Sequence, residues 1–322
     1  MTNYRIGIPR GLMYYYYYPA WEEFFRGLGL EIVVSPPTNR GLLERGVSRS
    51  VDDLCLPFKA YFGHVDELKD MVDYLFIPRF FKLGDNNSVC PKFMGLPDMV
   101  RAVFAGEGLP PLLDPVVDLK KGLFSLRRLA HQLGKRLNRG YWQVERAFWK
   151  GLYRLQASRE KRWQSQDSYQ PGKSPDQSPQ QLTVAVLGHL YLIRDECLSL
   201  GLIRELQERG VRVITHEDLA PEILEQAACR QPKPSFWYYN RQLMGAAYHL
   251  LAGRGDSTEG IIQLNAFGCG PDSLISELIE LKGKRDKRIA MMNVNVDEHS
   301  GQAGLITRLE AFIDLLERRK NK

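Results

Sequence analysis

The sequence predicts an α/β protein with two parallel-sheet lobes and a basic helical segment between them. Three observations lead to this prediction. Short apolar strands alternate with amphipathic helices over residues 1–120, the same alternation resumes at residue 182, and the stretch between has a helical period and a strong positive charge. Strands that alternate with helices are typical of parallel sheets whose faces the helices cover.

The first lobe, residues 1–120, reads as strand, helix, strand, helix, helix and strand. Gly and Pro residues punctuate these elements, and Thr38-Asn39 is a suitable helix cap. In chain order we expect a strand at 4–9, a helix at 20–28 after Pro19, a strand at 31–35, helices through 45 and at 56–72, and a strand at 74–78.

The segment 121–163 is expected to be helical and basic. Leu126, Leu129, Leu133 and Leu137 are three and four residues apart, which is the spacing of one helix face. Residues 127–162 contain eleven Lys/Arg and two Glu, a local charge of +9, so the rest of the chain sums to −3 of the total +6. The segment 164–181 is polar, contains three prolines and is predicted to be a linker.

The second lobe, residues 182–322, repeats the alternation. Its first strand runs into Gly188-His189, and a later strand leads to Cys269. We expect strands at 183–187, 211–215, 260–264 and 289–296, and helices at 195–209, 240–251, 271–282 and 304–319.

Several function classes are disfavoured by composition and motif. No apolar run approaches the roughly 18 residues of a membrane span, and the first residues lack a secretory pattern, so we expect a cytoplasmic protein. The sequence has no Gly-rich phosphate loop of the ATP-binding or dinucleotide-binding type. If ATP enters the chemistry, a partner hydrolyses it.

The five cysteines divide into two groups. Their odd number and wide spacing argue against a disulfide framework. Cys197 and Cys229 are interpreted as structural thiols of the core. Cys55, Cys90 and Cys269 each lie in a loop bounded by Pro or Gly, where free backbone N–H groups suit sulfur bound to iron.

These three cysteines are predicted to meet and to hold a metal. Three thiolates suit an iron–sulfur cluster with one iron left open, or a zinc site with His64 or His299 as the fourth ligand. Glu298 and His299 follow the last strand and are candidates for acid/base groups. His189 also ends a strand, and its side chain could be an acid/base group, a ligand or a satisfied surface residue.

Aromatic residues interleaved with the basic segment open a further alternative. Phosphate neutralisation and base stacking could bind nucleic acid there, or the surface could meet a partner protein. We favour a simpler reading, in which the aromatics pack against a lobe, because aromatics at helical spacing usually pack.

Several longer motifs of this chain are similar to those of a known family. The chain resembles the activase-related branch (component D-like) of the 2-hydroxyacyl-CoA dehydratase superfamily. The resemblance covers nearly the whole chain and is carried by Ile6-Gly7-Ile8-Pro9-Arg10, Tyr17-Tyr18-Pro19, Val51-Asp52-Asp53-Leu54-Cys55-Leu56-Pro57-Phe58-Lys59, Gly63-His64-Val65, Ile77-Pro78-Arg79, Cys90-Pro91-Lys92-Phe93-Met94-Gly95-Leu96-Pro97-Asp98, Phe267-Gly268-Cys269-Gly270-Pro271-Asp272-Ser273, Asp297-Glu298-His299-Ser300-Gly301-Gln302-Ala303-Gly304 and Thr307-Arg308-Leu309-Glu310-Ala311-Phe312.

The resemblance implies two Rossmann-like lobes with a 4Fe-4S cluster between them. Residue by residue, it places the ligands on Cys55, Cys90 and Cys269. One motif departs from the family pattern, because Gly188-His189-Leu190-Tyr191-Leu192 stands where Gly-His-Pro-Tyr-Asn is usual. The role of that loop and of the 164–181 insert is therefore open.

The resulting hypothesis is an oxygen-sensitive iron–sulfur protein that accepts a low-potential electron from an ATP-dependent activase. It would reduce or dehydrate a small substrate, with an acyl-CoA as one candidate, while Glu298 and His299 handle protons or tune the cluster. The alternative is a non-catalytic electron carrier or scaffold that docks on the activase through Arg127, Arg128, Lys135 and Arg136. One chain could form the site, or a homodimer could bring clusters together.

Overall fold

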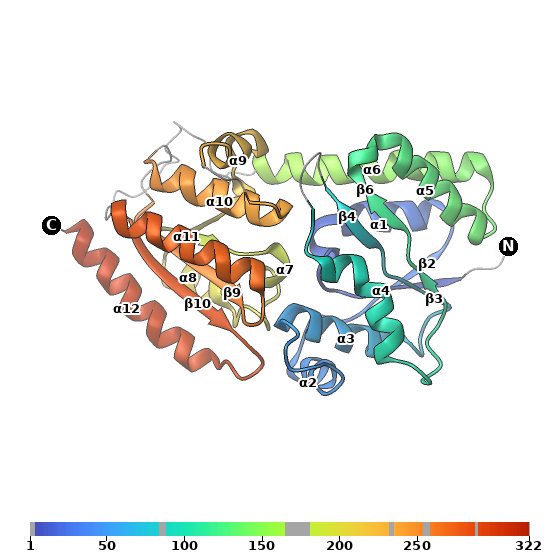
Figure 1. Cartoon of the computed structure of the whole chain (residues 1–322), viewed down its shortest axis with the longest axis horizontal. Coiled ribbons are helices and arrows are strands. Elements are labelled where there is room, and N and C mark those ends of the chain that lie inside the picture. The colour runs from blue at the N-terminus through green and yellow to red at the C-terminus, as the bar shows by residue number, and fades with distance from the viewer. Residues whose placement is uncertain are drawn as a thin grey trace. The chain divides into compact units, whose positions relative to one another are not determined.

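The computed structural model describes residues 4–83, 88–164, 181–231, 235–253, 258–286 and 289–321. The chain divides into two compact units, Met1–Glu160 and Lys161–Lys322 (Figure 1). Most of the predicted linker 164–181 falls outside the described residues. No helix within the described ranges is both long enough and apolar enough to cross a membrane.

The first unit is built on a four-stranded parallel sheet in the order β2-β1-β3-β5. Ile8 pairs with Val34, and Phe76 pairs with Leu113. A second, two-stranded parallel sheet joins β4 to β6. The elements are β1 (Arg5–Ile8), α1 (Tyr14–Gly27), β2 (Glu31–Val34), α2 (Arg40–Ser48), α3 (Leu56–Leu68), β3 (Tyr74–Phe76), β4 (Arg79–Lys82), α4 (Pro91–Val103), β5 (Leu112–Leu113), β6 (Val116–Asp118), the 3-10 turn η1 (Leu119–Lys121), α5 (Gly122–Arg136) and α6 (Tyr141–Gln164).

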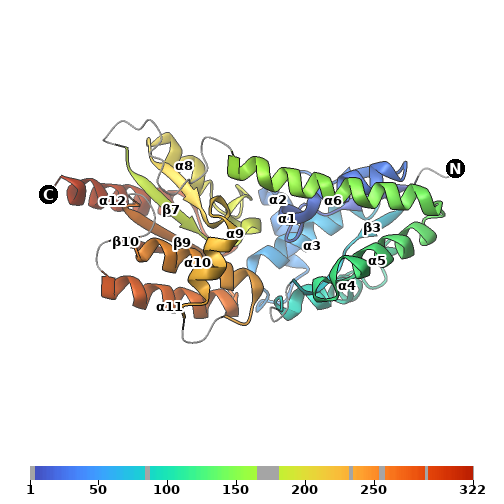
Figure 2. The ribbon, with the colours of Figure 1, turned by 90° about the horizontal axis from the view of Figure 1, so that it is seen from above.

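The second unit is built on a parallel sheet in the order β10-β9-β7-β8. Figure 2 shows α10 and α11 on one face of this sheet and α8 and α12 on the other. The elements are β7 (Thr183–Leu187), α7 (Leu190–Ile193), α8 (Leu202–Glu208), β8 (Arg212–Thr215), the 3-10 turn η2 (His216–Asp218), α9 (Pro221–Ala228), α10 (Tyr238–Leu251), β9 (Gly260–Ala266), α11 (Gly270–Asp286), β10 (Ala290–Val296) and α12 (Gln302–Lys320).

The two main sheets have the same strand order. In each unit the strands lie in the order second, first, third and fourth along the chain. The predicted fold class, an α/β protein with two Rossmann-like parallel-sheet lobes, is therefore confirmed. In such sheets the connections change direction between the first and third strands, and ligands bind beyond the carboxyl ends of the strands at that point.

The basic helices α5 and α6 pack on the core of the first unit. Leu133 and Leu137 are buried in a cluster with Ile6 and Phe25, while Leu126 and Leu129 pack against its margin. The leucine spacing of this segment thus marks the helix face that covers the first sheet.

Helices α2 and α3 cross closely because a glycine lies at their contact. A Cβ atom on Gly63 would lie 2.1 Å from the backbone oxygen of Leu42. The side-chain oxygen of Asn39 accepts a hydrogen bond from Leu42 N (3.0 Å) and caps α2. The crossing fixes α3 and therefore the start of that helix at Leu56.

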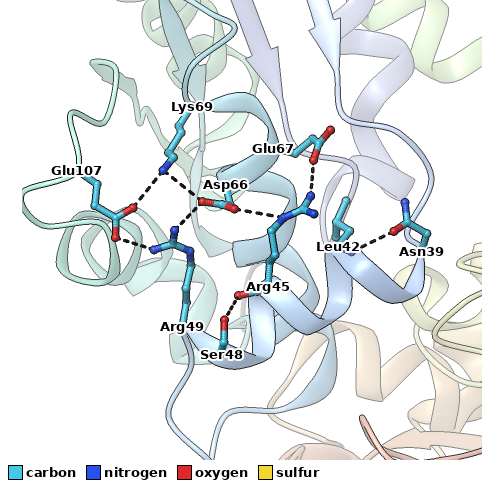
Figure 3. A network of polar contacts seen from close by, with 9 residues as sticks. All are labelled: Asn39, Leu42, Arg45, Ser48, Arg49, Asp66, Glu67, Lys69 and Glu107. Carbon is cyan, nitrogen blue, oxygen red and sulfur yellow. Dashed lines mark hydrogen bonds and ion pairs between the residues drawn. The ribbon is translucent and has the colours of Figure 1, made fainter.

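An ion-pair network braces the same two helices and the loop after α4 (Figure 3). Asp66 on α3 pairs with Arg49 (2.8 Å), the residue directly after α2, and with Lys69 (3.3 Å). Both cations also reach Glu107, at 2.6 Å and 3.1 Å. A network in which the central carboxylate is only 12% exposed holds helices in place better than single surface pairs do.

Two predicted helix starts are wrong. The helix predicted at 20–28 begins earlier, at Tyr14, and includes Pro19. Stacking of Tyr17 on Phe80, with ring centroids 5.2 Å apart, gives the early turns of α1 a packing partner. Proline therefore removes one hydrogen bond without ending the helix.

The helix predicted at 195–209 begins only at Leu202. Leu200 and Gly201 have φ values of 56° and 71°, in the left-handed region, which interrupts a right-handed helix. Before them, the carboxylate of Asp195 accepts hydrogen bonds from Cys197 N and Leu198 N, both at 3.1 Å. This local side-chain bonding stabilises a turn in place of the helix.

Candidate metal centre

Each of the three singled-out cysteines directly precedes a helix. Cys55 and Cys90 are the N-cap residues of α3 and α4, and Cys269 immediately precedes α11. In every case the cysteine carbonyl accepts an early hydrogen bond of the helix. The bonds run from Phe58 N to Cys55 O (3.0 Å), from Phe93 N to Cys90 O (3.0 Å) and from Ser273 N to Cys269 O (3.0 Å).

Proline in the first turn explains why the helices begin there. Pro57 and Pro91 occupy first-turn positions, where a missing N–H removes no intrahelical bond. The remaining first-turn N–H groups have no intrahelical acceptor, and the positive end of the helix dipole favours a thiolate. All three positions therefore suit a sulfur ligand.

Two of these cysteines are brought to the same part of the first unit. Phe58 lies three residues after Cys55, and Phe93 lies three residues after Cys90. Their rings are in contact, with centroids 5.2 Å apart and planes at 57°, and both side chains are buried. The first turns of α3 and α4 thus pack against each other.

Cys90 and Cys269 occupy equivalent places in the two units. Cys90 precedes α4, which leads to β5, the fourth strand of the first sheet; Cys269 precedes α11, which leads to β10, the fourth strand of the second. The repeated strand order therefore places a cysteine and a proline-containing first turn at the same point of each lobe.

In the second unit, Cys269 belongs to a cluster of ligand-capable side chains. His189, Cys269 and Asp272 each offer one possible ligand atom within 4.8 Å of the others. His189 follows β7, and Cys269 follows β9, the neighbouring strand. These two strands flank the point at which the strand order reverses, where binding sites of such sheets form.

A glycine allows the turn that carries His189. A Cβ atom on Gly188 would lie 2.6 Å from the backbone oxygen of Leu264 on the adjacent strand. Any larger residue would push this turn away from β9. The close approach keeps His189 against the residues that follow β9.

Asp272 is the buried centre of the cluster. Its Oδ1 lies 2.8 Å from Nε2 of His189 and accepts a hydrogen bond from Nδ2 of Asn240 at 3.0 Å. Burial raises the pKa of Asp272, but the charge of His189 and hydrogen bonds from His189, Cys269 and Asn240 outweigh it and hold the pKa below its usual value. The carboxylate is therefore ionised at neutral pH and held by neighbouring donors.

His189 is held in one orientation by its neighbours. Its ring stacks on Tyr191, with centroids 4.9 Å apart, and meets the ring of Tyr239 edge-on. The side chain is 6% exposed, and its Nδ1 has no hydrogen-bond partner among the described residues. A buried ring nitrogen without a partner is suited to a further hydrogen-bonding ligand or, in the neutral ring, to a metal.

Glu298 and His299 lie in a tight turn after β10. Oδ1 of Asp297 accepts hydrogen bonds from His299 N (3.0 Å) and from Ser300 Oγ (2.7 Å). His299 is exposed and Glu298 is half-buried. Among the described residues, the ligand-capable group around Cys269 comprises His189 and Asp272 rather than these two.

His64, the other histidine considered for a zinc ligand, is engaged inside the first unit. Its Nδ1 lies 2.9 Å from Ser35 Oγ and its Nε2 lies 3.0 Å from Thr38 Oγ1. Burial, and then the nearby charge of Arg10, lower the pKa of His64 to about 3. A neutral ring with both nitrogens bonded to hydroxyls positions β2 and α3 and is poorly suited to bind a metal.

The remaining cysteines lie elsewhere. Cys197 is half-buried in the turn after Asp195. The expectation that Cys229 is a core thiol is wrong, since Cys229 is exposed. Its sulfur lies 3.4 Å from Glu225 Oε1 and 3.2 Å from Nη2 of Arg241, because α9 ends there and the last turn faces α10.

One member of the cluster, Asp272, and its hydrogen-bond partner Asn240 were not predicted from the sequence. Asp272 stands in the Cys-Gly-Pro-Asp motif, and its position in the first turn of a helix, three residues after a cysteine, is the signal that could have identified it. Asn240 carries no comparable signal, because only the packing of α10 beside α11 brings it to the carboxylate.

The donor sets present fit two kinds of metal group. In each unit, a thiol at a helix start with backbone N–H groups nearby is suited to bind iron in an iron–sulfur cluster, whose sulfurs accept such hydrogen bonds. The His189, Cys269 and Asp272 set fits a single divalent ion such as zinc. Cys269 is common to both.

Comparison with protein families finds one match that covers most of the chain. The family model described as the CoA enzyme activase uncharacterised domain matches residues 5–219, about two thirds of the chain. The chain belongs to this family. The match contains Cys55, Cys90 and His189 and ends before Cys269.

Membership of the activase domain family connects the chain with the activation of CoA enzymes. A search of curated proteins finds no match.

Proposed function

We propose that the chain is an iron–sulfur redox protein of the activase-related, component D-like branch of the 2-hydroxyacyl-CoA dehydratase superfamily. In this proposal Cys55, Cys90 and Cys269 bind a 4Fe-4S cluster, and the protein receives low-potential electrons from an ATP-dependent activase. The observation that carries the proposal is the shared position of the three cysteines, each at the start of a helix.

A 4Fe-4S cluster at these cysteines would supply one low-potential electron to a small bound substrate that is reduced or dehydrated. The chain's own contribution is the binding and electrostatic environment. Thiolates at helix N-termini are stabilised by the helix dipole and by first-turn N–H groups. This stabilisation would affect how readily a cluster bound there accepts an electron.

His189 and Asp272 support this environment from the second unit. Asp272 accepts hydrogen bonds from His189, Asn240 and Cys269, so the start of α11 is held in one arrangement. Glu298 and His299 are proposed to handle protons or to hydrogen-bond groups around the cysteines. The substrate is proposed to be a small molecule, with an acyl-CoA as one candidate, and a homodimer is a further possibility of assembly.

This chemistry needs a reducing compartment without oxygen, so the proposal places the protein in the cytoplasm. The experiment combines the anaerobically prepared protein with an ATP-hydrolysing activase, ATP and a chemical reductant. We expect a reduced-cluster EPR signal that depends on ATP and disappears in Cys269→Ala, while Cys197→Ala retains it. A signal of equal size without ATP would contradict activase-driven reduction.

The second candidate function is a non-catalytic electron carrier or scaffold that docks on an activase. The exposed side chains of Arg128, Lys135 and Arg136 on α5 favour it, because a basic helix face can steer an acidic partner. Arg127, also predicted to dock, instead pairs with Glu145 at 2.8 Å.

A charge-neutralised variant separates the two functions. Replacing Arg128, Lys135 and Arg136 by Gln should weaken activase binding without changing metal content. The matched control replaces the exposed basic residues Arg318, Arg319 and Lys320 of α12 by Gln. Equal binding by both variants would show that the α5 face is not a docking site, and substrate turnover by the intact system would exclude a carrier-only function.

A further inference from the structure

The first unit contains an apolar cavity that the proposed function does not use. It has a volume of about 290 Å³ and lies among α1, the sheet strands and the helices α5 and α6. Its walls include Trp21 of α1, Phe80 of β4, Leu126 and Leu129 of α5, and Leu152 and Leu155 of α6. All of these residues belong to the first unit.

The cavity wall is apolar and reaches the surface. Phe80 at the sheet is buried, whereas Trp21, Leu126, Leu129 and Leu155 are only half-buried. Apolar side chains around empty space lose dispersion contacts, and a ligand that fills the space restores them. A dry cavity of about 150 Å³ is already large enough to bind benzene, so this one can accept a ligand roughly twice that size.

One cation stands at the edge of the cavity. Arg159 on α6 lines it, with its guanidinium carbon 5.8 Å from the centre of the Tyr17 ring. No ion pair joins Arg159 to a carboxylate within the described parts of the chain, whereas Arg127 on α5 is paired with Glu145. The charge of Arg159 is thus available to a bound anion.

We propose that this cavity binds an amphiphilic monocarboxylate, with its apolar tail among the leucines and aromatics and its carboxylate at Arg159. A carboxylate suits the fork of N–H donors on a guanidinium. At about 30 Å³ for each non-hydrogen atom, the cavity holds a tail of about ten atoms. A shorter carboxylate would leave part of the cavity unfilled. A neutral amphiphile of the same length would fill the cavity but offer no anion to Arg159.

The experiment is isothermal titration calorimetry of the full chain with decanoate, 1-decanol and acetate. We expect saturable binding of one decanoate per chain, weaker binding of decanol and no binding of acetate. Arg159→Gln should weaken decanoate binding about fivefold, the upper range for an exposed ion pair, and leave decanol unchanged. Arg146→Gln removes an exposed charge from the same helix and should change neither.

A cavity-filling variant, Leu129→Trp, tests where the tail lies. It should weaken decanoate and decanol alike by at least about tenfold, since each methylene that no longer fits forfeits about fourfold in affinity. Position 129 is partly exposed. The circular dichroism spectrum of the variant checks that it is folded. The proposal is overturned if the unmodified chain does not bind decanoate. It is also overturned if Leu129→Trp binds decanoate as tightly as the unmodified chain, or if Arg146→Gln weakens decanoate binding as much as Arg159→Gln does.

The cavity and the metal centre are tested independently. The titrations are repeated on metal-free protein and on protein with its metal, and the affinity for decanoate should be the same. If the chain proves to bind no iron–sulfur cluster, decanoate should still bind with the same affinity, because the cavity residues include none of the three cysteines.

Discussion

The rings of Phe58 and Phe93 lie with their centroids 5.2 Å apart, and each follows a cysteine by three residues. This contact packs the first turn of α3 against the first turn of α4. The N-cap positions of Cys55 and Cys90 therefore depend on two buried aromatic side chains as well as on their own backbone geometry.

The variant Phe93→Leu should reduce metal retention more than its loss of stability explains. Leucine keeps an apolar side chain, so the free energy of unfolding should fall by only about 1.5 kcal/mol or less. The shorter side chain leaves Phe58 without its ring partner and loosens the starts of both helices. The measurement is iron per folded chain after anaerobic reconstitution, with unfolding in urea.

The control for this prediction is Phe25→Leu. Phe25 on α1 is also buried, but its ring packs against Phe76 of the sheet. It forms no ring pair with Phe58 or Phe93 among the described residues. It should lose comparable stability and retain its iron. Equal iron loss in both variants would show that general stability, rather than the Phe58–Phe93 contact, governs retention.

Gly63→Ala should destabilise the first unit strongly. The new Cβ atom would lie 2.1 Å from the backbone oxygen of Leu42, so α2 and α3 have to separate. We expect a loss of about 1–3 kcal/mol in the free energy of unfolding, as in overpacked cores. Urea denaturation followed by circular dichroism measures it.

Gly95→Ala is the matched helix control for Gly63→Ala. Beyond its chain neighbours and the backbone of its own helix, no atom lies within 4 Å of a Cβ at position 95, and the residue lies inside α4. Alanine should therefore be neutral or stabilise the protein by up to about 1 kcal/mol, because it favours helix over glycine. Similar losses in the two variants would contradict a specific α2–α3 contact.

Asp272→Asn should change how stability depends on pH. The pKa of Asp272 in the folded protein lies below its ordinary value of 3.8. Its ionised form therefore contributes stability at pH values above 3.8, and that contribution is lost as the pH falls through the folded pKa. Asparagine lacks the contribution at every pH.

The measurement is the free energy of unfolding of both proteins at pH 7 and near pH 3. At pH 7 the variant should be less stable by about 1–3 kcal/mol, because a hydrogen-bonded buried charge is lost. The difference should shrink in acid. A difference that stays constant or grows toward low pH would contradict the assignment of an ionised Asp272.

The fold class could be predicted because its signals are local. Strand runs such as 183–187 and the leucine spacing of α5 report directly on burial, and both lobes follow the strand and helix alternation. The wrong start of α8 has a different origin. Asp195 bonds to its own following backbone, and residues 200 and 201 adopt left-handed conformations, neither of which hydrophobic periodicity can report.

The candidate site was only partly accessible from sequence for the same reason. Cys55, Cys90 and Cys269 could be selected because proline and glycine beside them mark loop and helix starts. Asn240 could not, because its role depends on the tertiary packing of α10 on α11. The engagement of His64 with Ser35 and Thr38 likewise depends on contacts between distant segments.

The most direct test of the central claim is the content of iron and acid-labile sulfide per chain in anaerobically purified protein. The account predicts about four of each, with an EPR signal on reduction. Cys269→Ala should lower both contents, whereas Cys197→Ala should not. One zinc ion per chain, no metal, or full iron content in Cys269→Ala would contradict an iron–sulfur cluster at these cysteines.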